Sequence, residues 1–285
     1  MSLTYHSFPH PFLIGLFGLL CGILVVSPLM LHAEEITTSD GRVINSPGMR
    51  RVENTIVVKI TTEGGGAVEM GVPISRITKV SFVEPPELAK ATDAAASGNA
   101  AQVLAVTSDF IAAQSDYKDL PGSWWLKMAE LRLLALAASG KDADTAALAM
   151  QIGSLNTPAT DSLARGGALF GPLAASDSQA VITGAKPLAH PGGNAGSALA
   201  QLALGRALLL KKDYPAAIRA FLSIKVFYSS LSLLQPAALL GAANAYDGLN
   251  DTKREMLTLK EIEKKFPNSM QAAEAADKEK QLSKP

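Results

Sequence analysis

His190 is the only histidine after residue 33 of this 285-residue chain, and it limits the chemistry that the chain can perform. A Ser-His-Asp triad would have to use this imidazole as its base. The surrounding stretch PLAHPGG is rich in proline and glycine, which predicts a loop, and the chain contains no Gly-x-Ser-x-Gly elbow. One histidine also cannot form a two-histidine metal site. We therefore expect no catalytic role for His190, no metal ion and no cofactor.

The single cysteine, Cys21, lies inside an apolar run near the start of the chain. One cysteine cannot form a disulfide bond within the chain or a cysteine zinc site, and we expect no thiolate chemistry after this run. A lipid-attachment cysteine normally follows a small residue, whereas Leu20 precedes Cys21. We interpret Cys21 as an apolar residue of a leader segment.

Two glycine-rich stretches are the places where a phosphate-binding loop could occur. They are Gly64-Gly65-Gly66 and Gly192-Gly193-Asn194. Neither continues into Gly-Lys-Ser/Thr, whose lysine and hydroxyl are needed to hold phosphate and Mg²⁺. Both stretches therefore predict turns.

Trp124 and Trp125 are the most conspicuous aromatic residues. Adjacent positions of a helix point about 100° apart, so the two indoles cannot share one face. Trp124 aligns with Met128, which indicates a core position. Trp125 aligns with Leu133 and belongs either to a second core face or to a ligand groove. Trp125 is therefore the candidate partner-binding residue.

The charged residues balance, with 26 basic and 26 acidic side chains, all of them after residue 33. Such a neutral chain gives no electrostatic reason to expect binding to nucleic acid or to an anionic membrane surface. Around Glu261 and Lys265, acidic and basic residues interleave at helical spacing, which is typical of a solvated face. Catalysis by two carboxylates, as in glycoside hydrolysis, is the enzymatic option that this composition leaves open.

The first 33 residues contain no charged side chain. An apolar run at Phe12–Val26 is followed by Ser27-Pro28 and by Ala33, which is the layout of a secretory signal peptide. We predict cleavage before Glu34 and a periplasmic or secreted mature protein. An uncleaved N-terminal anchor is the alternative, because the leader lacks the usual basic residues and is nearly long enough to span a membrane. Contact with a membrane is expected only in that case.

Residues 34–84 favour a small antiparallel β domain. β-branched residues are dense in Asn54–Thr62, and Ser39-Asp40-Gly41 and the glycines after Glu63 predict turns between strands. A last strand is expected at Thr78–Val83. The order of these segments resembles the small β-barrels of the SH3-like and Sm-like families.

Pro85-Pro86 ends the β-rich part, because proline cannot donate to a strand ladder and favours the start of a helix. From there to residue 281 alanine and leucine dominate with a helical period. The expected helices are 87–96, 99–114, 122–139, 142–154, 159–170, 176–188, 197–211, 214–229, 236–248, 251–266 and 269–281. Helices of this length joined by short turns predict an α-solenoid of helix pairs.

The clearest repeat lies near the C-terminus. One helix carries Leu204-Gly205, a two-residue turn follows, and the next helix carries Tyr214, Ala217 and Phe221. This spacing resembles the tetratricopeptide repeat (TPR), in which the Leu-Gly pair admits a close partner helix and the aromatic residues fill the core between the two helices. A second, degenerate copy contributes Leu240, Gly241, Tyr246, Phe266 and Pro267 to the expected repeat core.

The fold class that we expect is therefore α+β and mainly α, with a β domain at 34–84 and a TPR-like helical domain at 87–281. The resemblance implies a non-enzymatic scaffold of the bacterial cell envelope that binds other proteins on a concave surface. The alternative is a carbohydrate-binding or hydrolase-accessory protein that uses groove aromatics and carboxylates. A cluster of exposed aromatic residues with paired carboxylates would favour that alternative.

Overall fold

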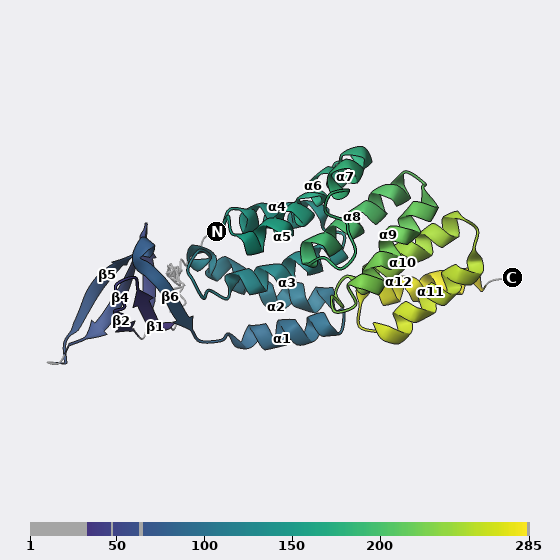
Figure 1. The fold of residues 1–285 in the computed structure, drawn as a ribbon. Coiled ribbons are helices and arrows are strands. Elements are labelled where there is room, and N and C mark those ends of the chain that lie inside the picture. The colour runs from purple at the N-terminus through teal and green to yellow at the C-terminus, as the bar shows by residue number, and fades with distance from the viewer. Residues whose placement is uncertain (1–32, 47, 63–64, 284–285) are drawn as a thin grey trace, which may run out of the picture.

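A computed structural model describes residues 33–46, 48–62 and 65–283. Within these ranges the chain forms six strands followed by helices α1 to α12, and the strands lie together at one end of the helical array (Figure 1). The chain is therefore mainly helical with a small N-terminal antiparallel β region, as predicted. The predicted signal peptide lies, apart from Ala33, outside the described residues, and the predicted cleavage point falls within the first strand.

The β region consists of two three-stranded antiparallel sheets, in the orders β2-β1-β6 and β3-β4-β5. Their register places Ile36 opposite Ile44 and Val80, and Ile56 opposite Val72, so that apolar side chains of both sheets meet in one small core. The strands are β1 (Ala33–Thr38), β2 (Val43–Asn45), β3 (Met49–Val52), β4 (Thr55–Thr61), β5 (Ala67–Pro73) and β6 (Ile77–Phe82). We did not predict β3, because its sequence MRRV carries two arginines and has little β propensity.

The helices follow the predicted spans closely. Pro86 occupies the first turn of α1, where its missing N–H is not needed, and the side chains of Asn99, Asp213 and Asp251 accept hydrogen bonds from the backbone at the starts of their helices. They are α1 (Pro86–Ala96), α2 (Ala100–Ala113), α3 (Trp125–Ala138), α4 (Asp142–Gly153), α5 (Pro158–Ala168), α6 (Phe170–Ala174), α7 (Ser178–Ala185), α8 (Ala195–Leu210), α9 (Tyr214–Phe227), α10 (Gln235–Gly248), α11 (Thr252–Lys265) and α12 (Met270–Leu282).

The short helix α6 was not expected. It follows α5 after one residue and contains Pro172 in its first turn. Proline cannot donate the hydrogen bond that would continue α5, whereas it is tolerated at a helix start. We expected one helix over residues 159–170. Instead α5 ends at Ala168 and the second helix, α6, begins at Phe170.

The loop between α2 and α3 packs against the β region. Tyr117 and Leu120 are buried in the core of the two sheets, and the Tyr117 hydroxyl donates to the Met49 carbonyl at 3.2 Å. Arg51 forms an ion pair with Asp119 at 2.6 Å. The Pro85-Pro86 boundary therefore does not separate the two cores, because the core of the β region takes side chains from a loop of the helical segment.

A Tyr117→Phe variant tests this junction. The substitution removes only the hydroxyl, so the buried Met49 carbonyl loses its donor while the packing of the ring is kept. We expect a loss of about 0.5–1.5 kcal/mol in the free energy of unfolding, measured by urea denaturation. Faster hydrogen exchange should be confined to the β region and the loop before α3. An unchanged free energy of unfolding would show that the hydrogen bond from Tyr117 to Met49 does not stabilise the junction.

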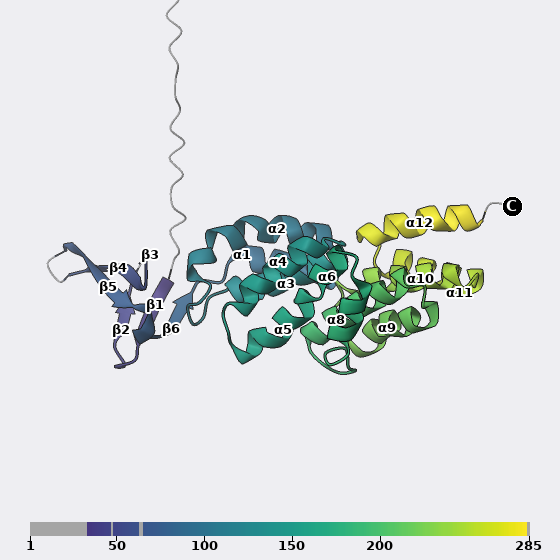
Figure 2. The ribbon, with the colours of Figure 1, turned by 90° about the horizontal axis from the view of Figure 1, so that it is seen from above.

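Segments far apart in the sequence also meet within the helical array. The Gln271 side chain donates to the Ala138 carbonyl at 2.8 Å, although the two residues are 133 positions apart. The turn at Gly98 lies against the ring of Phe266 and against Pro236. In an extended solenoid each repeat contacts only its neighbours. Here the start of α12 instead lies beside the end of α3, which Figure 2 shows from above.

Candidate functional site

Phe221 of α9 lies between α8 and α10 and is 1% exposed. Its ring packs against Gly205 of α8 and Gly241 of α10, and a Cβ at Gly205 would stand 2.6 Å from the ring. A Cβ at Gly241 would come closer still. The two glycines therefore provide the space that this aromatic side chain fills. Ala217, one turn earlier on α9, is buried in the same cluster.

The other residues of the expected repeat core differ in burial. Tyr246 and Leu240 are buried, and Tyr214 packs half-buried against Gly248. Leu204 and Phe266 are also only half-buried. Pro267 is exposed, which corrects its assignment to the core: α11 ends at Lys265, and the proline follows as a residue that cannot continue the helix.

The two tryptophans differ in burial, and the structure decides between the two alternatives for Trp125. Trp125 is fully buried, and its indole N–H donates to the Ile111 carbonyl of α2 at 3.2 Å. This burial corrects the prediction of Trp125 as a partner-binding residue, because a partner cannot reach its ring. Trp124 is half-buried instead, and it lines a recess. Trp124 stands just before the first residue of α3, which begins at Trp125.

His190 lies in the loop before α8, as expected, and contacts Ser197. The Ser197 hydroxyl lies 3.3 Å from Nδ1 of His190, and the Tyr228 hydroxyl donates to the His190 carbonyl. Ser197 is 3% exposed, so a substrate has no access to its hydroxyl. Among the described residues no carboxylate pairs with His190. The contacts therefore fasten this loop to α8 and to the end of α9 and form no catalytic triad.

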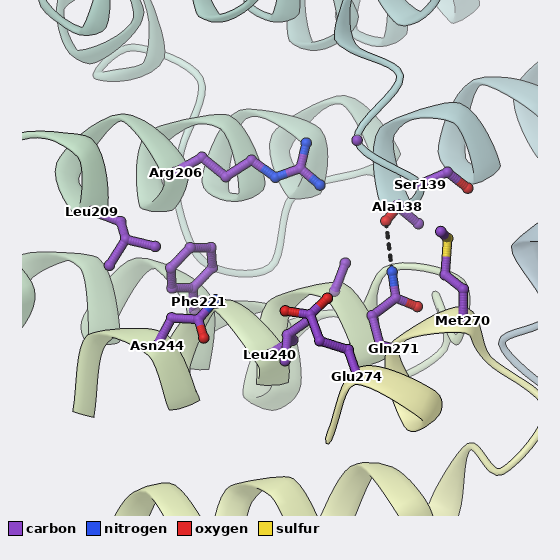
Figure 3. A pocket seen from close by; sticks show the side chains of 13 residues that line it. Ala138, Ser139, Arg206, Leu209, Phe221, Leu240, Asn244, Met270, Gln271 and Glu274 are labelled. Atoms are coloured by element: carbon purple, nitrogen blue, oxygen red, sulfur yellow. Dashed lines mark hydrogen bonds between the residues drawn. The ribbon is translucent and has the colours of Figure 1, made fainter. Parts of the chain in front are cut away.

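A recess of about 330 Å³ opens between α3, α8, α10 and α12, and Figure 3 shows its side chains. We call it the Arg206 recess. It is lined by Ala138, Ser139, Gly140, Arg206, Leu209, Phe221, Ala237, Leu240, Gly241, Asn244, Met270, Gln271 and Glu274. Its floor is the ring of Phe221 and its rim includes Met270, so the predicted helix-pair core lies directly beneath it. No single element carries this site, and sequence patterns therefore did not predict it.

Arg206 itself is already paired. Its guanidinium forms an ion pair with Asp142 at 2.9 Å and donates to the Ala137 carbonyl at 2.7 Å. Burial lowers the pKa of Arg206 below its ordinary value and raises the pKa of Asp142, while each partner's charge opposes these shifts. The pair thus contributes no net charge to the recess and ties α8 to the start of α4.

Three other polar groups of the recess have no such partner. The Ser139 hydroxyl and the Asn244 side-chain oxygen are buried and make no hydrogen bond within the described part of the chain. The Glu274 carboxylate, on the exposed side of α12, forms no ion pair with any described residue. A buried polar atom without a partner costs free energy, which a bound group could recover by forming a hydrogen bond with it.

A second recess, of about 690 Å³, lies between α1 and the start of α3. Trp124, Leu88 and Leu126 give it an apolar lining, and Asp93 and Glu130 also border it. We call it the Trp124 recess. It places one half-buried aromatic ring near two carboxylates, which is part of the combination expected for the carbohydrate-binding alternative, without the cluster of exposed aromatic residues.

Glu255 is the buried carboxyl group of α11 and is 3% exposed. Burial raises its pKa above the ordinary value and the Asp247 carboxylate raises it further, while Lys278 lowers it. A carboxyl group whose pKa is higher in the folded state favours the protonated form on folding. Its ionisation therefore costs stability as the pH rises above the ordinary glutamate pKa of about 4.3.

We expect Glu255→Gln to stabilise the protein at pH 7, since the amide fits the site without a charge. The gain should shrink as the pH falls and vanish below pH of about 4, where Glu255 is protonated in both states. Thermal unfolding of both proteins across this pH range measures the effect. Asp277→Asn, on the exposed face of α12, is the matched control for loss of one negative charge. A less stable Glu255→Gln variant at pH 7 would contradict this account.

Comparison with protein-family models, with curated proteins and with solved structures finds no match to this chain. Among the described residues no helix has both the length and the apolarity needed to cross a membrane. The same part of the chain contains no group of three histidine, cysteine or carboxylate side chains placed to hold a metal ion.

Proposed function

We propose that this protein is an exported, non-enzymatic scaffold of the bacterial cell envelope that binds another protein through the Arg206 recess. The proposal combines the predicted signal peptide with the resemblance of the α8 to α11 sequence to TPR helix pairs. The observation that carries it is the recess itself, in which buried polar atoms without partners lie beside an exposed methionine. Met270 is 52% exposed although it is large and apolar.

A partner segment would gain affinity in two ways. Contact with Met270 and with the half-buried Leu209 would remove apolar surface from water, which contributes about 25 cal/mol per Å². Hydrogen bonds to Ser139 and Asn244 would satisfy groups that are buried without partners. Interfaces commonly depend on a few such desolvated positions, so we place the most sensitive binding residues here.

The experiment is capture of envelope proteins by the purified protein and by two matched variants. Met270→Lys introduces a positive charge at the rim of the recess and should abolish capture of the partner. Leu257→Lys is the control, because Leu257 is 60% exposed on α11 and does not line the recess. Both variants change exposed positions and should fold normally. A partner that is retained by Met270→Lys, or lost equally with both variants, would contradict the proposal.

The Trp124 recess supports a second candidate, a carbohydrate-binding or hydrolase-accessory protein. Sugar rings would stack on the half-buried indole while Asp93 and Glu130 accept hydrogen bonds from hydroxyl groups. Binding of a panel of envelope glycans to the wild type and to Trp124→Ala tests it. Turnover that is abolished by Asp93→Asn or Glu130→Gln would replace the scaffold proposal with an enzymatic one.

A further inference from the structure

We infer that the Arg206 recess receives a basic side chain, arginine or lysine, of the partner segment. The inference rests on the proposed function and specifies the chemistry of the group that is bound. It follows from the balance of charges, acceptors and apolar surface within the recess.

The charge balance of the recess is negative. Arg206 and Glu274 are the charged residues among those that line it. The Arg206 charge is compensated by Asp142 at 2.9 Å, outside the lining. The Glu274 carboxylate remains as the uncompensated charge, and Figure 3 shows it on the wall opposite Arg206. A cation is therefore the ligand that this site favours, and an anion would meet Glu274 with no available positive charge.

The unsatisfied polar groups are also acceptors. A carboxylate and the Asn244 side-chain oxygen can only accept hydrogen bonds, and the Ser139 hydroxyl can accept as well as donate. A guanidinium presents five N–H donors and an ammonium presents three, with no acceptor. Either group could donate to all three of these groups, whereas a carboxylate or a backbone carbonyl could not donate to Glu274 or to the Asn244 oxygen.

The apolar lining suits the rest of such a side chain. Lysine and arginine bury their methylene stems along apolar surface while the charged end reaches a polar partner. Leu209, Leu240 and the exposed Met270 provide that surface around the polar groups. A recess of about 330 Å³ has room for one long side chain and a small part of the segment that carries it.

The test uses two short probes and the isotopically labelled protein. Acetyl-Leu-Arg-Leu-amide carries the cation, and acetyl-Leu-citrulline-Leu-amide is its neutral analogue of nearly the same shape. We expect the arginine probe to shift the side-chain amide signal of Asn244 with a Kd on the order of 1 mM. The citrulline probe should bind at least about tenfold more weakly, because it cannot form the ion pair.

Three variants test whether the charge of the recess, and not a change in the fold, determines binding of the arginine probe. Glu274→Gln should weaken the arginine probe about tenfold, and Asn244→Asp should strengthen it by adding a second anion. Asp277→Asn removes a charge from the same helix outside the recess and should leave binding unchanged. Equal binding of the two probes, no shift of Asn244 at about ten times the expected Kd, or tighter binding of acetyl-Leu-Glu-Leu-amide would overturn the inference.

The capture experiment distinguishes failure of the cation inference from failure of the scaffold proposal. If Met270→Lys loses the partner while the two probes bind equally, the recess is a binding site without a preference for cations. If Met270→Lys still captures the partner and neither probe binds, both proposals are wrong.

Discussion

Replacement of Phe221 by alanine is expected to lower the free energy of unfolding by about 3–5 kcal/mol. The ring is 1% exposed and fills the space between Gly205 and Gly241, so its removal leaves a cavity between three helices. Both glycines lack the side chain that could collapse into that cavity. Urea denaturation followed by circular dichroism measures the loss.

The matched control is Leu257→Ala, at a position of α11 that is 60% exposed. We expect a change within about 0.5 kcal/mol, as for other surface substitutions. A loss of less than about 1 kcal/mol for Phe221→Ala would place the ring outside a tightly packed core. The TPR-like alignment would then fail at its best-supported residue. Since Phe221 also lines the Arg206 recess, the same variant should weaken the proposed binding of a partner.

Trp125→Ala is expected to have an effect of similar size, about 3–5 kcal/mol. Two losses combine at this position. The indole is fully buried in the helical core, and its N–H satisfies the Ile111 carbonyl at 3.2 Å, which would lose its donor. Thermal and urea unfolding should both show the change.

Trp124→Ala provides the comparison, since Trp124 is the neighbouring tryptophan and is only half-buried. Its loss should be clearly smaller, because less apolar surface returns to water. Equal losses for the two variants would contradict this difference in burial. A clearly larger loss for Trp124→Ala would favour Trp124 as the core residue and return Trp125 as a candidate for partner binding.

The helices were the most predictable part of this protein. Their spacing depends on local signals, which are the helical period of apolar residues, the side-chain caps such as Asn99 and Asp213, and the prolines at helix starts. These signals act within a few residues of one another and can therefore be read along the chain. The Leu-Gly and aromatic spacing around Phe221 is local in the same sense, since it involves two consecutive helices.

The Arg206 recess could not be predicted in this way. Its polar groups come from the end of α3, from α8, from α10 and from α12, and no spacing relates Ser139 to Glu274. The observation that finds them is the burial of polar atoms without partners, which exists only in three dimensions. The exposed Met270 is informative for the same reason, because exposure is a property of the fold.

The sequence alone determined that the chain is mainly helical after Pro86, that a small β region precedes it, and which side chains are available for chemistry. Tertiary structure decided which surfaces remain open. It buried Trp125 and left Trp124 at a recess, and it joined Tyr117 to the β core. It also brought Gln271 to Ala138. The physical reason is that secondary structure follows from short-range periodicity and capping, whereas burial and the meeting of distant residues follow from how whole helices pack.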